Sequence, residues 1–130
     1  MTICDELIPK LQERFPGRGL RIGLPPLPCA VFPAIHPEVG AVEIYDDGGE
    51  LTIVAGNFTH GHFSNYDEGL SEEQWAKQIV DDVVRFLDDL FADQIILWGS
   101  HQASGGWYHR DKSSTRKHHT NEYVWSGPFK

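Results

Sequence analysis

Sulfur-containing residues are scarce in this chain, whose 130 residues include two cysteines and one methionine. Cys4 and Cys29 stand too far apart for the C-x-x-C spacing of zinc ribbons and thiol oxidoreductases. We therefore expect two free and largely buried thiols, as is usual in a reducing compartment. A domain of this length buries enough apolar surface to fold without disulfides or a structural metal.

Long apolar runs are also absent. The longest, Leu24–Ile35, is interrupted by four prolines, whereas a membrane-spanning helix needs about 20 apolar residues. Asp5 and Glu6 lie where a secretory signal would carry positive charge. These features predict a cytoplasmic protein with no membrane partner.

The familiar catalytic motifs are missing, since the sequence contains no phosphate-binding lysine loop, nucleophile elbow or H-E-x-x-H motif. The nearest acid–base candidates are Tyr108, His109 and Arg110, together with Glu122. Alternation along a strand places Tyr108 and Arg110 on one face and His109 on the other, so these groups are not expected to converge. The residues favour a non-enzymatic function over a catalytic one.

Basic residues are few, and they are unevenly placed. The chain has 11 Lys and Arg against 19 Asp and Glu, a formal net charge of −8. Residues 1–21 contribute +1, residues 22–109 contribute −12 and residues 110–130 contribute +3. An acidic body with a basic C-terminal segment disfavours nucleic acid and anionic membranes as partners.

Apolar residues at intervals of four predict a helix near the N-terminus, ended by Pro16 and Gly17. This first helix has one apolar stripe, formed by Ile3, Leu7, Leu11 and Phe15. The proline-rich segment that follows suggests an extended connection or an edge strand around Ala30–Ile35.

A β-hairpin is the clearest local signal. The segments Ala41–Asp47 and Glu50–Thr59 flank Gly48 and Gly49, which tolerate the positive φ of a two-residue turn. That turn pairs Ile44 with Ile53 and makes one face of the hairpin apolar. The other face then carries polar side chains and, in the absence of a bulge, the histidines that follow.

A long helix is predicted from Ser71 to about Asp93, because Ser71 and Gln74 form a capping box. Its core-facing stripe contains Trp75, Ile79, Val83, Phe86, Leu87 and Leu90. Two pairs of aspartates lie two helical turns apart on its polar side, namely Asp81, Asp82, Asp88 and Asp89. Carboxylates near the C-terminal end oppose the helix dipole, so this flank is a candidate surface for a cationic partner.

Short strands are expected at Ile95–Trp98, Gly106–Arg110 and Tyr123–Trp125. The element order α-β-β-β-α-β-β predicts a single α+β domain over residues 1–130. In it an antiparallel sheet packs on the long helix in two layers, with the N-terminal helix beside it. Residues 111–121 are polar and basic, and we expect a flexible loop there.

A metal site is one functional hypothesis. His60 and His62 project to the same face of a strand and could both reach one zinc ion. A third ligand is needed, and Glu43 on the same face is the first candidate, with Asp67 or His101 as alternatives. The H-x-H spacing alone lacks the closed ligand pattern that makes zinc motifs specific.

Binding of a basic protein is the hypothesis that the charge distribution favours, with Asp81, Asp82, Asp88 and Asp89 as contacts. Small acidic proteins that neutralise basic toxins or chaperone basic clients have a similar size and charge, which is an analogy of class only. A third hypothesis is that the basic segment Arg110–Lys117 binds a phosphate-bearing ligand.

Overall fold

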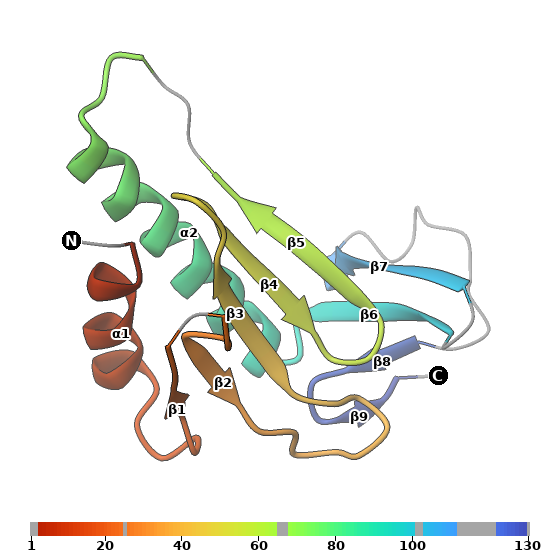
Figure 1. The fold of residues 1–130 in the computed structure, drawn as a ribbon. Coiled ribbons are helices and arrows are strands. Elements are labelled where there is room, and N and C mark those ends of the chain that lie inside the picture. Colours follow the sequence, from red (N-terminus) through yellow and green to blue (C-terminus); the bar gives the residue numbers. More distant parts are fainter. Residues whose placement is uncertain (1–2, 25, 65–67, 101–102, 112–121, 130) are drawn as a thin grey trace.

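The fold is seen in a computed structural model that describes residues 3–24, 26–64, 68–100, 103–111 and 122–129 (Figure 1). The predicted flexible loop at 111–121 therefore lies almost entirely outside the described residues. Within these described residues, two helices and nine strands follow one another. They are α1 (Ile3–Arg14), β1 (Arg21–Ile22), β2 (Ala30–Phe32), β3 (Val42–Asp46), β4 (Leu51–Ala55), β5 (Thr59–Phe63), α2 (Glu72–Phe91), β6 (Ile95–Ser100), β7 (Ala103–His109), β8 (Glu122–Val124) and β9 (Gly127–Pro128).

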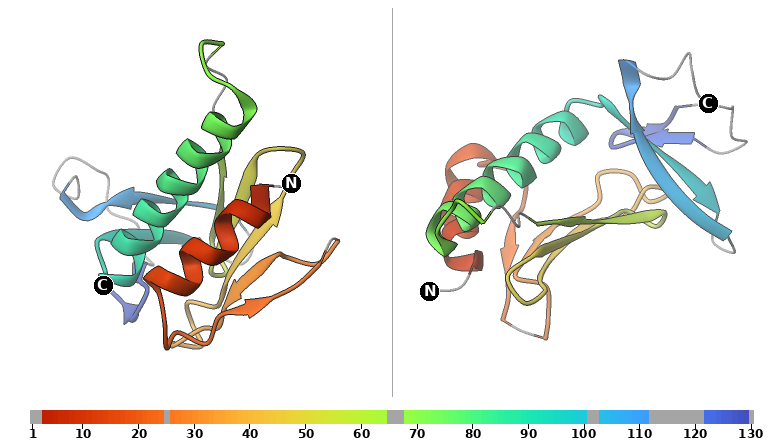
Figure 2. Two further views of the ribbon diagram at one scale, coloured as in Figure 1. Left: turned by 90° about the vertical axis from the view of Figure 1, so that its left-hand side faces the viewer. Right: turned by 90° about the horizontal axis from the view of Figure 1, so that it is seen from above.

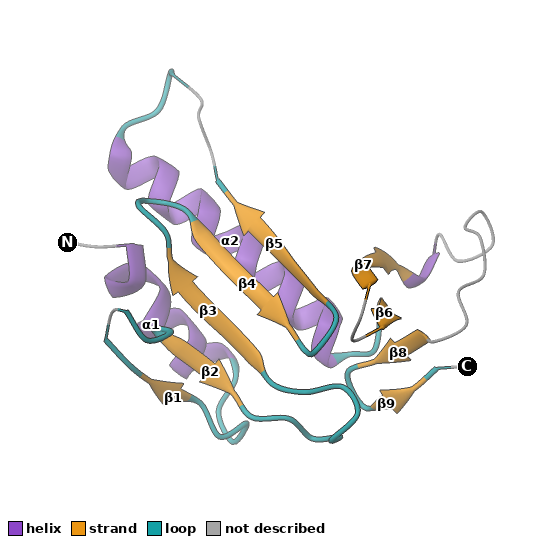
Figure 3. Cartoon of the chain, turned by 45° about the vertical axis from the view of Figure 1, so that its right-hand side comes forward, coloured by secondary structure: helices purple, strands orange, loops and turns teal. Residues whose placement is uncertain are grey.

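Strands β1 to β5 form an antiparallel sheet in sequence order. Helices α1 and α2 lie side by side on one face of this sheet (Figure 2), and both are behind it in Figure 3. The face turned toward the viewer in Figure 3 carries no helix, and we call it the open face. The predicted α+β architecture, with an N-terminal helix and one long helix on an antiparallel sheet, is confirmed.

The central hairpin has the predicted register. Ile44 pairs with Ile53, Val42 with Ala55 and Asp46 with Leu51. Gly48 and Gly49 have φ values of 69° and 95°, which a two-residue turn of this type requires and which side chains disfavour. Ile44 and Ile53 are fully buried against the helices, so the apolar face of the hairpin is the core face.

The later strands form a second antiparallel sheet, of order β7-β6-β8-β9, where the sequence predicted a single sheet. Aromatic rings occupy the space between β5 and β7: Phe86 of α2 contacts both Phe63 and Trp107 edge-on. Around Trp107 the sheets therefore meet through packed side chains. At Gly105 the backbone of β7 instead passes close to the carbonyl group of Phe58. Ile95, Leu97 and Trp125 complete the main core from this side.

Both helices bury the stripes that their periodicity predicts. All four stripe residues of α1 are buried, although Pro9 lies inside that helix. In α2 the capping box of Ser71 and Gln74 is present, and every stripe residue is buried except the half-buried Trp75. Neither of the described helices combines the length and the apolarity needed to cross a membrane.

Candidate functional site

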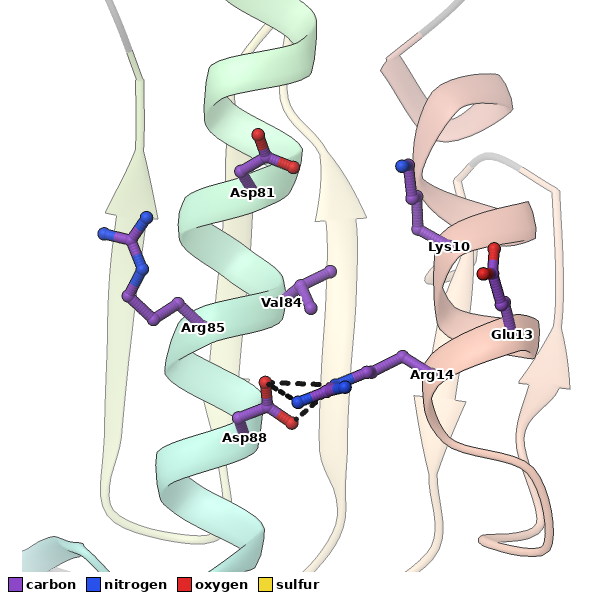
Figure 4. Close-up of a pocket in the computed structure, with 7 residues that line it drawn as sticks. All are labelled: Lys10, Glu13, Arg14, Asp81, Val84, Arg85 and Asp88. Atoms are coloured by element: carbon purple, nitrogen blue, oxygen red, sulfur yellow. Dashed lines mark hydrogen bonds and ion pairs between the residues drawn. The ribbon is translucent and has the colours of Figure 1, made fainter.

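The four aspartates on the polar side of α2 differ in their surroundings. Arg14 of α1 reaches across to Asp88, with its Nε 3.0 Å and its Nη2 3.0 Å from carboxylate oxygens (Figure 4). This contact raises the pKa of the Arg14 guanidinium, first through the hydrogen bonds and then through the charge of Asp88. Asp88 thus joins the two helices.

Asp89 and Asp82 also have side-chain partners within the chain. Asp89 Oδ2 lies 3.3 Å from Nε2 of His109, whose Nδ1 is 3.1 Å from Asp111. Asp82 lies 3.8 Å from Arg85 one turn later. Among the ion pairs of the described residues, Asp81 takes part in none. Three of the four predicted contact residues therefore already have a partner within the protein, and Asp81 is the one that forms none of these pairs.

The groove between α1 and α2 is mixed in charge rather than acidic. Its volume is about 480 Å³, and it is open along both helices. Three basic and three acidic side chains line it with one valine, and Figure 4 shows them. The lining consists of Lys10, Glu13, Arg14, Asp81, Val84, Arg85 and Asp88. Balanced charge of this kind does not select a polycation.

Asp93 at the end of α2 has a structural role that sequence reasoning missed. Its φ is 59°, the one positive value among the described non-glycine residues. Its carboxylate accepts hydrogen bonds from the backbone N–H and the hydroxyl of Ser126, at 3.1 and 2.6 Å. Asp93 therefore fastens the helix to the β8–β9 turn, and tolerance of positive φ by aspartate was the available signal.

The two predicted histidine ligands lie together on the open face. In β5, His60 is opposite Val54 and His62 is opposite Thr52, and both side chains are exposed. Their ring centroids are 5.4 Å apart. Glu43 pairs with Val54 from the other side, so it lies two strand spacings from His60, about 9.5 Å between backbones. His101 and Asp67 lie outside the described residues.

A different set of carboxylates approaches His62. Asp47 and Glu50 flank the glycine turn of the β3–β4 hairpin, and with His62 they form the one such group within the described residues. One ligand atom from each of the three lies within 4.8 Å of the others. We call this group the hairpin triad. Sequence reasoning missed it because the β4–β5 register, which brings His62 beside the turn, was not predicted.

Thr52 organises the hairpin triad. Its Oγ1 donates to Asp47 Oδ2 at 3.3 Å and lies 2.9 Å from His62 Nδ1. These two contacts hold the imidazole of His62 beside the carboxylate of Asp47, as groups that orient metal ligands do. A hollow of about 290 Å³ adjoins this group on the open face, between Thr52 and His60.

The acid–base candidates of the C-terminal region separate as predicted. His109 faces Asp89, whereas Tyr108 is on the opposite face and donates a short hydrogen bond to Glu122 Oε2. Glu122 is 1% exposed, and no donor reaches its Oε1 from the described residues. Arg110 packs over the ring of Phe129 and donates to the carbonyl of Asp93. These groups hold the second sheet and do not surround a common point.

Cys4 and Cys29 are neighbours in the fold, although 24 residues separate them in the sequence. Both thiols are free, and both line the same pocket. A hydrogen bond between them lowers the pKa of Cys29, whereas at Cys4 the same bond, burial and the charges of Asp46 and Asp5 raise the pKa. The pair joins the first turn of α1 to the residue before β2, a proximity that sequence spacing does not reveal.

Comparison with protein-family models, with curated proteins and with solved structures found no match for this chain.

Proposed function

We propose that this protein binds a divalent metal ion at the hairpin triad of Asp47, Glu50 and His62. The observation that carries the proposal is the convergence of three ligating side chains within 4.8 Å. Ligand atoms around a bound zinc ion are about 3.4 Å apart, so a small rotation of these side chains would close the site. Two carboxylates and one imidazole suit Zn²⁺ or Mn²⁺.

Three protein ligands leave coordination positions for water or for a ligand on the open face. A metal in such a position polarises an oxygen that binds to it, which is the chemistry it would supply. The hollow beside His60 is next to these positions because Thr52 borders both. His60 would then contact a ligand bound to the metal. It would not itself be a metal ligand together with Glu43, as the sequence predicted.

Calorimetric titration of the full chain, purified without a histidine tag, tests this proposal. Mn²⁺ is the main probe because thiols bind it weakly, and Zn²⁺ is the second. We expect one equivalent to bind and His62→Ala to abolish binding, while the matched variant His60→Ala retains it. Absence of binding, or equal loss in both variants, would contradict the hairpin triad as the site.

We also propose, as a second function, that the protein binds a basic protein partner in the cytoplasm, in the manner of small immunity or chaperone proteins. The support is the segregated charge, with −12 in residues 22–109, and the exposure of Asp81 and Asp82 on α2. Asp88 and Asp89 would contribute less, because Arg14 and His109 already engage them.

Affinity capture from native cells at low and high salt tests the partner, followed by direct binding of the purified partner. Asp81→Asn with Asp82→Asn should weaken binding, and the effect should shrink as salt screens the charges. The matched control, Glu72→Gln with Glu73→Gln, removes the same charge from the start of α2. The proposal fails if no partner binds directly or if both pairs of substitutions act alike.

A further inference from the structure

We propose that Cys4 and Cys29 form a thiol–disulfide exchange site whose co-substrate is a small cationic disulfide. This inference is independent of the metal site, since it rests on a different pocket and on different residues. It requires two thiols in contact, access for a small molecule, and a feature that selects the charge of that molecule. The structure contains all three.

The two thiols line the same pocket, and each changes the pKa of the other, so they lie next to each other. Cys29 belongs to the main core and is 3% exposed, whereas Cys4 is half-buried on α1. Because Cys4 donates the hydrogen bond, the negative charge of a thiolate is favoured on Cys29. Burial opposes that charge, and the lowered pKa of Cys29 shows that the hydrogen bond outweighs it.

Access is provided by a pocket of about 490 Å³ between α1 and the β1–β2 segment. Both cysteines line it, and most of its other lining is apolar. Ile22 and Leu24, which also line it, are 54% and 79% exposed, so the mouth of the pocket presents apolar surface. An aliphatic disulfide would have apolar contacts there that solvent does not provide.

Charge selection comes from Asp5 and Asp46, which line the same pocket. Their negative charges reach the thiol of Cys4, whose pKa they help to raise. Carboxylates at the entrance repel an anionic disulfide and attract a cationic one. We therefore expect cystamine, a diammonium disulfide, to react faster than glutathione disulfide, which is an anion.

The exchange proceeds in two balanced steps. The Cys29 thiolate attacks one sulfur of the external disulfide, forms a mixed disulfide and releases one thiolate. Cys4 then loses its proton, and its thiolate attacks the Cys29 sulfur, forms the Cys4–Cys29 disulfide and releases the second thiolate. Two cysteine thiols are oxidised, the external disulfide is reduced to two thiols, and the two cysteine protons go to the released thiolates.

Intact-mass kinetics of the reduced full chain with cystamine or glutathione disulfide test the proposal. The expected product is an intramolecular disulfide, a loss of about 2 Da. Cys4→Ala should stop at a mixed disulfide on Cys29, and its alkylation should require higher pH because the bond that lowers the Cys29 pKa is gone. A stable mixed disulfide on the unaltered protein, or a Cys29→Ala variant that reacts as fast, would overturn it.

Charge selection is tested separately with Asp5→Asn and Asp46→Asn together. The preference for cystamine should fall by about tenfold, whereas Glu72→Gln with Glu73→Gln, which removes equal charge elsewhere, should leave it unchanged. If Asp5→Asn with Asp46→Asn leaves the preference for cystamine over glutathione disulfide unchanged, the proposal of a cationic co-substrate is wrong. Titration of the unaltered protein with phenylarsine oxide needs no variant: one arsenical should consume both thiols, and independent thiols would contradict the exchange pair.

Discussion

Two acidic regions of this molecule have opposite surroundings. Along the C-terminal half of α2, Asp88, Asp89 and Asp93 each contact a different element, namely α1, β7 and the β8–β9 turn. At the β3–β4 turn, Asp47 and Glu50 approach each other and His62, and no Lys or Arg within the described residues forms an ion pair with them. The first region uses its carboxylates to join elements, and the second leaves them available for a cation.

The largest expected effect is a loss of metal affinity when the carboxylates of the β3–β4 turn are removed, and it tests the difference between the two regions. Asp47→Asn with Glu50→Gln removes two of three ligands, so we expect Mn²⁺ affinity to fall by more than about 100-fold. The melting temperature of the metal-free protein should change little, because Asp47 is exposed and Glu50 is only half-buried at the hairpin turn. Calorimetry and thermal unfolding on the same samples provide both measurements.

The reciprocal variants complete that comparison. Asp88→Asn with Asp89→Asn should keep the Mn²⁺ affinity of the unaltered protein and lower its melting temperature, since Arg14 and His109 lose their partners. If the α2 variants weaken metal binding, or if the hairpin variants unfold the protein, the division between the two regions is wrong.

Most of the fold could be predicted because its signals are local. The capping box of Ser71, the stripe of α1 and the turn at Gly48–Gly49 depend on residues within one or two turns of each other. The division into two sheets could not be predicted in this way, since it depends on Phe63, Phe86 and Trp107, which are far apart in the sequence.

The candidate sites were harder to predict than the fold, for the same reason. The shared face of His60 and His62 follows from alternation along one strand. The approach of His62 to Asp47 requires the β4–β5 register, and the contact of Cys4 with Cys29 requires α1 to pack on the sheet. Counting charges along the sequence identifies the acidic residues of α2. It does not reveal that Arg14 of α1 forms an ion pair with Asp88.

The second largest effect tests whether Asp93 fastens α2 to the β8–β9 turn. Asp93→Ala removes two hydrogen bonds to Ser126 and places a β-carbon residue with no polar group at φ 59°. We expect a loss of about 2 kcal/mol in the free energy of unfolding, measured in urea. Asp93→Asn should lose less, and Asp81→Ala, on the same helix, should change stability by under about 0.5 kcal/mol. Equal effects at positions 81 and 93 would refute the fastening role.

A third effect concerns the hydroxyl that positions His62. Thr52→Val keeps the shape of the side chain but removes the bonds to Asp47 and His62. Loss of a group that orients a metal ligand weakens binding by about 10-fold or more, whereas Thr52→Ser should retain the unaltered affinity. Equal Mn²⁺ affinity in Thr52→Val and Thr52→Ser would show that the Thr52 hydroxyl does not position His62.

The smallest effect is expected at the ion pair that joins the helices. Arg14 and Asp88 are 60% and 35% exposed in their side chains, so solvent screens much of their attraction. Arg14→Lys cannot reproduce the paired Nε and Nη2 contacts with the carboxylate, and it should lower the melting temperature slightly at low salt. At 1 M salt, where charges are screened within roughly 3 Å, the difference should vanish. A difference that persists at high salt would assign the role of Arg14 to the packing of its stem against α2, and the ion pair with Asp88 would then not be what joins α1 to α2.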